Sequence, residues 1–327
     1  MRRWLQVIAV AAALLLLVAC GGSQAGAAAS ERPPEGTTTR QLRVLLYQFS
    51  GTRTFDLLRR QVAFGPRVPG TPAHQQCRDF IKQELSAYCD SVAEQSFPAV
   101  VNERKYEFFN VTGYIHPEAE RVVILAAHYD TRPFADMDSP ENYSTPIPGA
   151  NDGASGVAVL LELARVLEPR LPDDIGVLFL FTDGEDTGRT ARQMFQGARY
   201  FASTMSPDLR SRIVFGILLD MVGDASLGIR REKNSEAVAP GIFTAILELQ
   251  DMLGLQGFLD AGERNVLDDH IPFIEQGVRM YDLIDIDYTH WHTLQDTVER
   301  CSAASLQVVG LCVANLVLNY ADGSFSL

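Results

Sequence analysis

Short apolar runs alternate with longer amphipathic segments over most of the chain. The runs RVVILAA and VLFLF are continuously apolar, as strands buried on both faces of a sheet should be. Strands are expected at 92–98, 107–115, 121–127, 175–181, 213–219 and 279–286, and helices at 71–88, 152–167, 196–205, 241–253 and 303–320. This alternation predicts an α/β fold, a three-layer αβα sandwich whose mixed central sheet is mostly parallel and has helices on both faces. The earliest two strands are candidates for an antiparallel edge.

The apolar spacing at 40–64 predicts a helical segment before the first strand. Leu42, Leu45, Leu46 and Phe49 recur at helical intervals there. A loop rich in glycine and proline follows at 65–72 and leads into the next helix.

The first 39 residues have a different composition. Arg2 and Arg3 precede an apolar stretch at 5–19, which is shorter than the roughly 20 residues of a membrane-spanning helix. Residues 1–20 are therefore expected to be a lipoprotein-type signal peptide ending at the lipidated Cys20, with a plain signal or a membrane anchor as the alternatives. Residues 21–39 are rich in Gly, Ala, Ser, Pro and Thr and predict a flexible tether.

One folded domain at 40–327 is the economical interpretation of the remainder. We expect an exported protein, lipid-anchored to a bacterial cell membrane on its periplasmic or cell-surface side, that meets the membrane only through its N-terminal lipid. The net charge of −13 argues against a nucleic-acid partner, because phosphates require a basic face. Export permits disulfides, but sequence leaves three pairings of Cys77, Cys89, Cys301 and Cys312 open, with buried free thiols as a further alternative.

Acidic residues and histidines follow the predicted central strands. The first ends at His128-Tyr129-Asp130, the second at Asp183-Gly184-Glu185-Asp186, the third at Asp220, and His292 follows the last. Sites in open α/β sheets form beyond the carboxyl ends of the strands, so these side chains are expected to share one crevice. Carboxylates and imidazoles are zinc ligands, and a dication removes the mutual repulsion of clustered acids. A serine-nucleophile elbow and a phosphate-binding loop are both absent from the sequence.

Each candidate residue also has an ordinary structural interpretation. Asp152 precedes a helix and could serve only as its N-cap, and Asp268 could cap a short helix before Pro272. Glu185 and Asp186 could form a solvated turn, although their place after a buried strand favours a functional pair. Asp130 is a candidate partner that orients His128 or Asp152. Trp291 could be a packing residue or, beside His292, the wall of a pocket.

Taken in order, these motifs resemble the zinc aminopeptidase and glutaminyl cyclase family. The segments that carry the resemblance are His128-Tyr129-Asp130, Gly149-Ala150-Asn151-Asp152-Gly153, Asp183-Gly184-Glu185-Asp186, Leu218-Leu219-Asp220, Asp268-Asp269-His270-Ile271-Pro272-Phe273 and Trp291-His292-Thr293. The resemblance implies that Asp152, Asp186 and His292 bind one zinc ion and that Glu185 is the general acid/base. In the aminopeptidase branch, His128 and Asp220 would hold a second zinc; in the cyclase branch, Asp220 and Asp268 would help transfer protons.

Two features favour the cyclase branch. The run beginning at Asp268 resembles the cyclase form, whereas aminopeptidases usually have serine there, and Trp291 is similar to a cyclase pocket wall. Three departures concern the substrate more than the metal: Asp186 replaces a glutamate, Asp282 aligns with a histidine, and a second pocket tryptophan has no counterpart.

The resemblance implies two enzymatic functions with the same base and metal. A glutaminyl-peptide cyclotransferase would convert the N-terminal glutamine of a peptide or protein to pyroglutamate and release ammonia. A zinc aminopeptidase would instead hydrolyse N-terminal residues with one or two zinc ions. A third hypothesis is a non-catalytic lipoprotein that keeps the fold as a binding module, although such a protein would have no need of Glu185.

Overall fold

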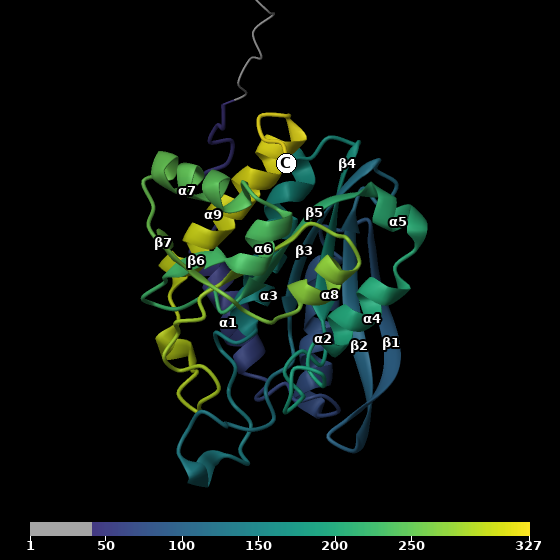
Figure 1. Cartoon of the computed structure of the whole chain (residues 1–327), viewed down its shortest axis with the longest axis vertical. Coiled ribbons are helices and arrows are strands. Elements are labelled where there is room, and N and C mark those ends of the chain that lie inside the picture. Colours follow the sequence, from purple (N-terminus) through teal and green to yellow (C-terminus); the bar gives the residue numbers. More distant parts are fainter. Residues whose placement is uncertain (1–40) are drawn as a thin grey trace, which may run out of the picture. The chain divides into compact units, whose positions relative to one another are not determined.

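A six-stranded sheet runs through the described part of the chain, residues 41–327 of this computed structural model (Figure 1). Its strands, in sheet order, are β1 (Ser91–Val101), β2 (Arg104–Ile115), β4 (Ile175–Thr182), β3 (Arg121–His128), β5 (Ile213–Asp220) and β8 (Met280–Ile284). The pairs β3–β4, β3–β5 and β5–β8 are parallel, whereas β1–β2 and β2–β4 are antiparallel. The predicted mixed sheet with an antiparallel edge is confirmed.

Helices cover both faces of this sheet. One core packs against α1 (Gly51–Val62), α2 (Pro72–Leu85), α3 (Ala154–Leu167), α7 (Ile242–Leu253) and α9 (Ala303–Ala321), and the other against α4 (Gln196–Thr204) and α8 (His270–Glu275). Alternate residues of β3 serve the two cores: Val123 belongs to the first and Val122 to the second. Because successive side chains of a strand point to opposite faces, a strand between two cores must be apolar throughout.

Helix α9 is long and apolar enough to cross a membrane, which holds for no other helix in the described range. Of its apolar window, 78% is buried inside the protein. Packing against α1, α3 and α7 therefore explains its composition.

The segment before α1 differs from the prediction. Residues 41–50 form no regular structure, and α1 begins at Gly51 after the N-cap Ser50. Leu46 and Phe49 are nevertheless buried. The backbone N–H of Leu46 donates to Asn315 Oδ1 of α9 at 2.9 Å, and Asn315 Nδ2 donates back to the Leu46 carbonyl at 2.9 Å. Side-chain amides thus satisfy a backbone that the apolar spacing assigned to a helix.

Smaller elements complete the described chain. A two-stranded parallel sheet pairs β6 (Ile229–Glu232) with β7 (Phe258–Arg264), and α6 (Lys233–Val238) follows β6; the sequence did not predict these three. The short helix α5 (Pro207–Arg212) leads into β5. The four cysteines at 77, 89, 301 and 312 are free thiols. Residues Arg40–Leu327 form one compact unit, whereas the predicted signal, Cys20 and the tether lie outside the described residues.

Candidate metal centre and active site

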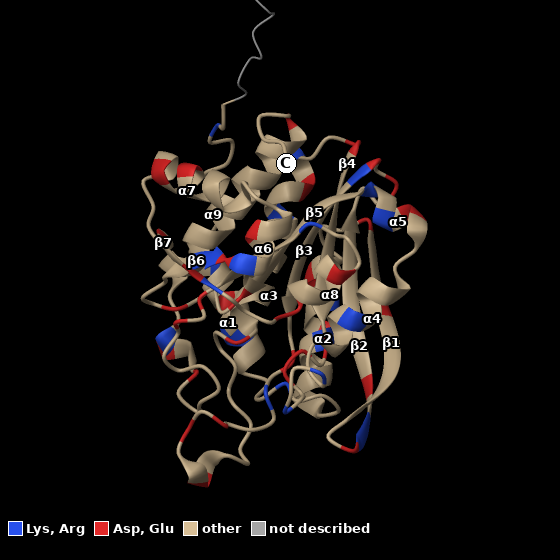
Figure 2. Cartoon of the chain, in the orientation of Figure 1, with Lys and Arg blue, Asp and Glu red and all other residues tan. Residues whose placement is uncertain are grey.

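Polar loops follow the carboxyl ends of the central strands. In the sheet β3 lies between β4 and β5, and such a switch point leaves a crevice beyond the strand ends. The predicted ligands, acids and bases are all buried there: His128, Asp130, Asp152, Glu185, Asp186, Asp220, Asp268 and His292. Figure 2 shows both acidic and basic positions on the loops that follow these strands.

The first group of possible metal ligands consists of Asp152, Asp186 and His292, whose ligand atoms lie within 4.8 Å of one another. His292 Nε2 is 3.3 Å from Asp186 Oδ1 and 3.7 Å from Asp152 Oδ2. Within the described residues, Oδ2 of Asp152 and Oδ2 of Asp186 are buried without a hydrogen-bond partner. Unpaired buried carboxylate oxygens are costly, and a cation between them would remove that cost.

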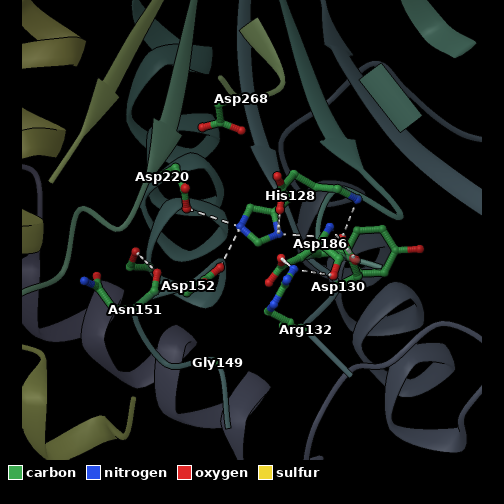
Figure 3. A network of polar contacts seen from close by, with 12 residues as sticks. His128, Asp130, Arg132, Gly149, Asn151, Asp152, Asp186, Asp220 and Asp268 are labelled. Atoms are coloured by element: carbon green, nitrogen blue, oxygen red, sulfur yellow. Dashed lines mark hydrogen bonds and ion pairs between the residues drawn. The ribbon is translucent and has the colours of Figure 1, made fainter. Parts of the chain in front are cut away.

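A second group lies beside the first and shares Asp152. His128 Nε2 is 3.2 Å from Oδ1 of Asp152 and 3.2 Å from Oδ1 of Asp220 (Figure 3). Burial lowers the pKa of His128, but hydrogen bonding to the surrounding carboxylates outweighs it and raises that pKa well above its ordinary value. Asp152 and Asp220 thus lie on the same ring nitrogen of His128 and favour its charged form.

The chain approaches His128 closely at Gly153. A Cβ atom at Gly153 would lie 2.4 Å from the His128 carbonyl oxygen and 2.6 Å from Nε2, so only glycine leaves room for the ring. Gly153 is the N-cap of α3, and Asp152 makes no capping hydrogen bond to this helix. The interpretation of Asp152 as a simple helix cap is therefore wrong, and its carboxylate is directed to the histidines.

Glu185 and Asp268 are buried carboxyl groups, Glu185 beside His128 and Asp186 and Asp268 near Asp220. Burial and then the charge of Asp186 raise the pKa of Glu185 well above its ordinary value. Burial and then the charge of Asp220 do the same for Asp268. Oδ1 of Asp268 accepts from the Asp269 N–H at 2.5 Å, whereas Oδ2 has no hydrogen-bond partner in the described structure. Groups with raised pKa values in one crevice are candidates for proton transfer.

Asp130 and Asp296 hold the backbone of the site. Asp130 accepts from the N–H groups of Glu185 and Asp186 at 3.1 and 3.3 Å, and its Oδ1 lies 3.6 Å from His128 Nδ1. Asp130 therefore lies beside His128, one of the two residues that it was predicted to orient. The partner of Asp152 is Asp296 instead, whose carboxylate accepts from the Asp152 N–H at 3.2 Å.

Sequence reasoning missed two further residues, Arg132 and Asp136. Arg132 Nη1 donates to Asp186 Oδ1 at 2.6 Å, and its Nε and Nη2 donate to Asp136 at 2.7 and 2.6 Å. Asp136 Oδ1 lies 3.3 Å from His292 Nδ1. The signal available in the sequence was an arginine two residues after Asp130, in a loop that already carried strand-end acids.

His292 and Trp291 pack against each other in the loop after β8. Their rings are stacked, with centroids 3.9 Å apart, and Trp291 packs partly buried against Met221 and Tyr288. His292 has a φ of 56°, a left-handed conformation that is uncommon outside glycine. Such a conformation persists where the surroundings determine it, which is frequent at functional sites.

A third buried group lies around His270. The ligand atoms of Asp268, His270 and Asp282 are within 4.8 Å of one another, and His270 Nε2 is 3.2 Å from Glu232 Oε2. His270 begins α8, and Asp269 precedes it without a capping hydrogen bond from its side chain. Asp268 and Asp269 are therefore not ordinary helix caps, and Asp282 faces His270 directly at 3.4 Å.

The ligand chemistry of the first group suits zinc. Two carboxylates and one imidazole are a common zinc-binding set, with room for a substrate atom at the remaining position. His292 has Nε2 directed to the carboxylates while Nδ1 faces Asp136, an arrangement typical of metal-bound histidines. The residues present therefore fit a zinc ion.

This fold and this site define a metal-dependent α/β enzyme. Residues 110–317 match Peptidase family M28, and the chain belongs to this family. The resemblance inferred from the motifs is confirmed.

Curated relatives of the chain include cyclotransferases. Glutaminyl-peptide cyclotransferase of Drosophila melanogaster is 27% identical over 281 residues, which cover 78% of this chain and 77% of the relative. Glutaminyl-peptide cyclotransferase of Bos taurus is 28% identical over 287 residues, covering 78% of each.

Similar solved structures include two that are named glutaminyl cyclases and one that is named a leucine aminopeptidase precursor. Glutaminyl cyclase of Bacteroides thetaiotaomicron, bound to N-acetylhistamine, has a TM-score of 0.79 and 32% identity, covering 84% of this chain and 99% of that one. Glutaminyl cyclase of Tannerella forsythia has a TM-score of 0.77 and 34% identity, covering 83% and 99%. A leucine aminopeptidase precursor from Bacteroides thetaiotaomicron also has a TM-score of 0.79 and 32% identity, covering 85% and 99%.

Proposed function

We propose that the chain is a zinc-dependent glutaminyl-peptide cyclotransferase acting on the N-termini of peptides or proteins. The observation that carries the proposal is the acid at position 268. The aminopeptidases that the motifs resemble usually have serine at this position. The carboxyl group of Asp268 is buried beside the charge of Asp220, and burial raises its pKa well above the ordinary value. A carboxyl that keeps its proton can donate it to a leaving amine. The similarity to cyclotransferases over most of the chain supports the same activity.

One zinc ion at Asp152, Asp186 and His292 is the metal content that the contacts support. Oδ2 of Asp152 and Oδ2 of Asp186, both buried without a hydrogen-bond partner in the described structure, belong to this group, whereas Oδ1 of Asp220 lies 3.2 Å from His128 Nε2. Zinc bound there would polarise the γ-carbonyl of the N-terminal glutamine.

The protein's acids would carry the protons of the reaction. Glu185 takes a proton from the α-amine, whose nitrogen forms a bond to the γ-carbonyl carbon. Glu185, assisted by Asp220 and Asp268, returns a proton to the amide nitrogen as its bond to that carbon breaks. The products are pyroglutamate at the peptide N-terminus and ammonia, and no water is consumed. The raised pKa of Glu185 suits a group that accepts and returns a proton in one turnover.

Trp291 would bound the pocket for the glutamine side chain, because it stacks on the ligand His292 and is only partly buried. The proposal extends to an exported enzyme that is anchored through a lipid on Cys20. The supporting feature is the composition of residues 1–39, in which a short apolar stretch ends at a cysteine and is followed by small residues.

An aminopeptidase with one or two zinc ions is the second candidate. The group of His128, Asp152 and Asp220 favours it, since these are the ligands that a second metal would use. In that reaction Glu185 would activate a water molecule for attack on the first peptide bond. The third candidate, a non-catalytic binding lipoprotein, predicts neither reaction.

A paired assay distinguishes the three candidates. The purified protein with zinc is offered a glutaminyl peptide and a leucyl peptide of equal length. Ammonia release from the first, with both chains intact, supports the cyclotransferase. Free leucine from the second supports the aminopeptidase, and a zinc-loaded protein inactive on both supports the binding module.

Glu185→Gln tests the proposed general acid/base. We expect the variant to bind zinc as the wild type does, because Glu185 is outside the proposed ligand set, and to lose at least about 100-fold in kcat, the contribution typical of such a group. Steady-state kinetics and elemental analysis of the same sample measure both quantities. Wild-type kcat in a zinc-loaded variant would contradict the mechanism.

A further inference from the structure

Two proposed zinc ligands, Asp186 and His292, are joined to each other by a pair of charged side chains. Arg132 contacts Asp186, and Asp136 contacts His292. Arg132 and Asp136 also contact each other through two hydrogen bonds of 2.7 and 2.6 Å, the two-pronged geometry that a guanidinium offers to a carboxylate. The four side chains close a ring, because His292 Nε2 lies 3.3 Å from Asp186 Oδ1.

Arg132 fixes the side chain and the backbone of Asp186 together. Its Nη1 donates to Asp186 Oδ1 at 2.6 Å, to the Asp186 carbonyl at 3.3 Å and to the Gly188 carbonyl at 3.2 Å. Arg132 is 4% exposed, so water does not compete for these donors. The arginine therefore occupies Oδ1 and leaves Oδ2 as the oxygen of Asp186 that has no partner in the described structure.

Asp136 fixes the other ligand. Its contact with Nδ1 selects the imidazole tautomer that leaves Nε2 free to bind a metal. Two further hydrogen bonds join the same two loops. The N–H of Met137 donates to the His292 carbonyl at 3.2 Å, and the N–H of Leu294 donates to Asp138 Oδ2 at 2.8 Å. These contacts hold His292 in its left-handed conformation.

We infer that Arg132 and Asp136 are positioning residues that set the zinc affinity of the site by holding Asp186 and His292 in their ligating geometry. The inference rests on the proposed zinc site. Opposite charges on the pair leave the net charge of the site unchanged, so their effect is exerted through orientation.

The test measures zinc dissociation constants of the full chain by competition with a chromogenic chelator. Arg132→Met and Asp136→Asn are each expected to weaken zinc binding about 10–100-fold, as the loss of such an orienting partner typically does. Arg132→Lys keeps the charge but cannot form the same set of fixed contacts, so it too is expected to weaken binding.

Two matched controls separate orientation from charge. Arg189→Met removes an exposed guanidinium that lies 4.0 Å from the same Phe134 ring that Arg132 covers at 4.3 Å. Glu141→Gln removes an exposed acid from the loop that carries Asp136. Both controls should bind zinc as the wild type does. The unfolding temperature of each metal-free variant shows whether a change in affinity merely follows a loss of folding.

The outcomes separate this inference from the proposed function. Wild-type zinc affinity in Arg132→Met and Asp136→Asn would overturn the inference, as would tighter binding by Arg132→Met or full wild-type affinity in Arg132→Lys. A wild type that binds no zinc would overturn the proposed zinc site itself.

Discussion

The buried carboxylates of the site differ in the hydrogen-bond donors and charges that surround them. Burial raises the pKa of both Asp130 and Glu185, but Asp130 accepts from two backbone N–H groups of the loop after β4, whereas Glu185 lies beside His128 and the charge of Asp186. The first carboxylate holds a loop in place, and the second is suited to proton transfer. Asp285, at the far end of the His292 loop, is buried as well, accepts from the Gly228 N–H at 2.8 Å and lies outside the proposed catalytic set.

Asp285 gives a prediction for stability against pH. Burial, and then the nearby charges of Asp224 and Asp287, raise its pKa from 3.8 to about 6. Because the folded state then binds more protons than the unfolded state, the contribution of Asp285 to stability is full below pH 4 and is lost as pH rises from about 4 to about 6. Asp285→Asn keeps an acceptor for Gly228 and cannot ionise.

Asp285→Asn is therefore expected to match the wild type at pH 4 and to exceed its free energy of unfolding by about 1–3 kcal/mol at pH 7. Urea unfolding of both proteins at intervals between these pH values measures the difference. A difference that does not change with pH would contradict the assigned ionisation.

Sequence predicted the residues at the centre of the site, and Asp130 beside them, but not Arg132, Asp136 and Asp296, which support them. His128 and Asp220 end strands, and their positions follow from the apolar runs before them. Arg132, Asp136 and Asp296 lie in loops, and hydrophobic periodicity predicts helices and strands but not the conformation of a loop. Their contacts depend on the folded chain, which brings the loops at 132–138 and 285–296 together.

Helix α3 packs on the sheet beside the site. It begins at Ala154, two residues after Asp152, and contacts β3 and β5, whose last residue is Asp220. At Gly156 the helix meets the sheet backbone, and a Cβ there would lie 2.1 Å from the Leu219 carbonyl oxygen and 3.0 Å from Ala127 Cβ. Only glycine permits this approach.

Gly156→Ala is expected to lower the free energy of unfolding by about 1–3 kcal/mol, because an added methyl group in a close-packed interior forces a shift. Differential scanning calorimetry of the metal-free protein measures the loss. Gly228→Ala is the matched control, since its added Cβ would meet no atom closer than 3.4 Å. An unchanged unfolding temperature for Gly156→Ala would show that α3 can move away from β5 without cost.

Elements buried on two faces were predictable, whereas those defined by polar contacts were not. β3 and β4 are continuously apolar because each lies between two cores. The strand β7 is mostly exposed and charged, and it gave no pattern to detect. Residues 41–50 had helical spacing without a helix, because Asn315 of α9 supplied the hydrogen bonds that a helix would have made.

On the scale of the whole molecule, an acidic domain with a net charge of −13 for the full chain follows a short apolar N-terminus. Burial at the strand ends of the sheet makes the clustered acids of the crevice costly, and a cation would offset that cost. The proposed lipid anchor would hold such a domain at a membrane through the predicted tether at 21–39.

Cys20→Ser tests the anchor. If the lipid on Cys20 is the membrane attachment, the variant should no longer incorporate a labelled fatty acid. Fractionation of bacteria that express the two forms, with labelling in parallel, measures attachment. Unchanged fatty-acid incorporation in Cys20→Ser would contradict the lipoprotein proposal.

The central claim is that the substrate's own amine, rather than water, attacks the carbonyl. The most direct measurement is mass spectrometry of a glutaminyl tripeptide after reaction with the zinc-loaded protein in water enriched in heavy oxygen. The account predicts an intact chain that is lighter by one ammonia and carries no heavy oxygen. Free glutamine and a shortened peptide, with heavy oxygen in the new carboxylate, would contradict it.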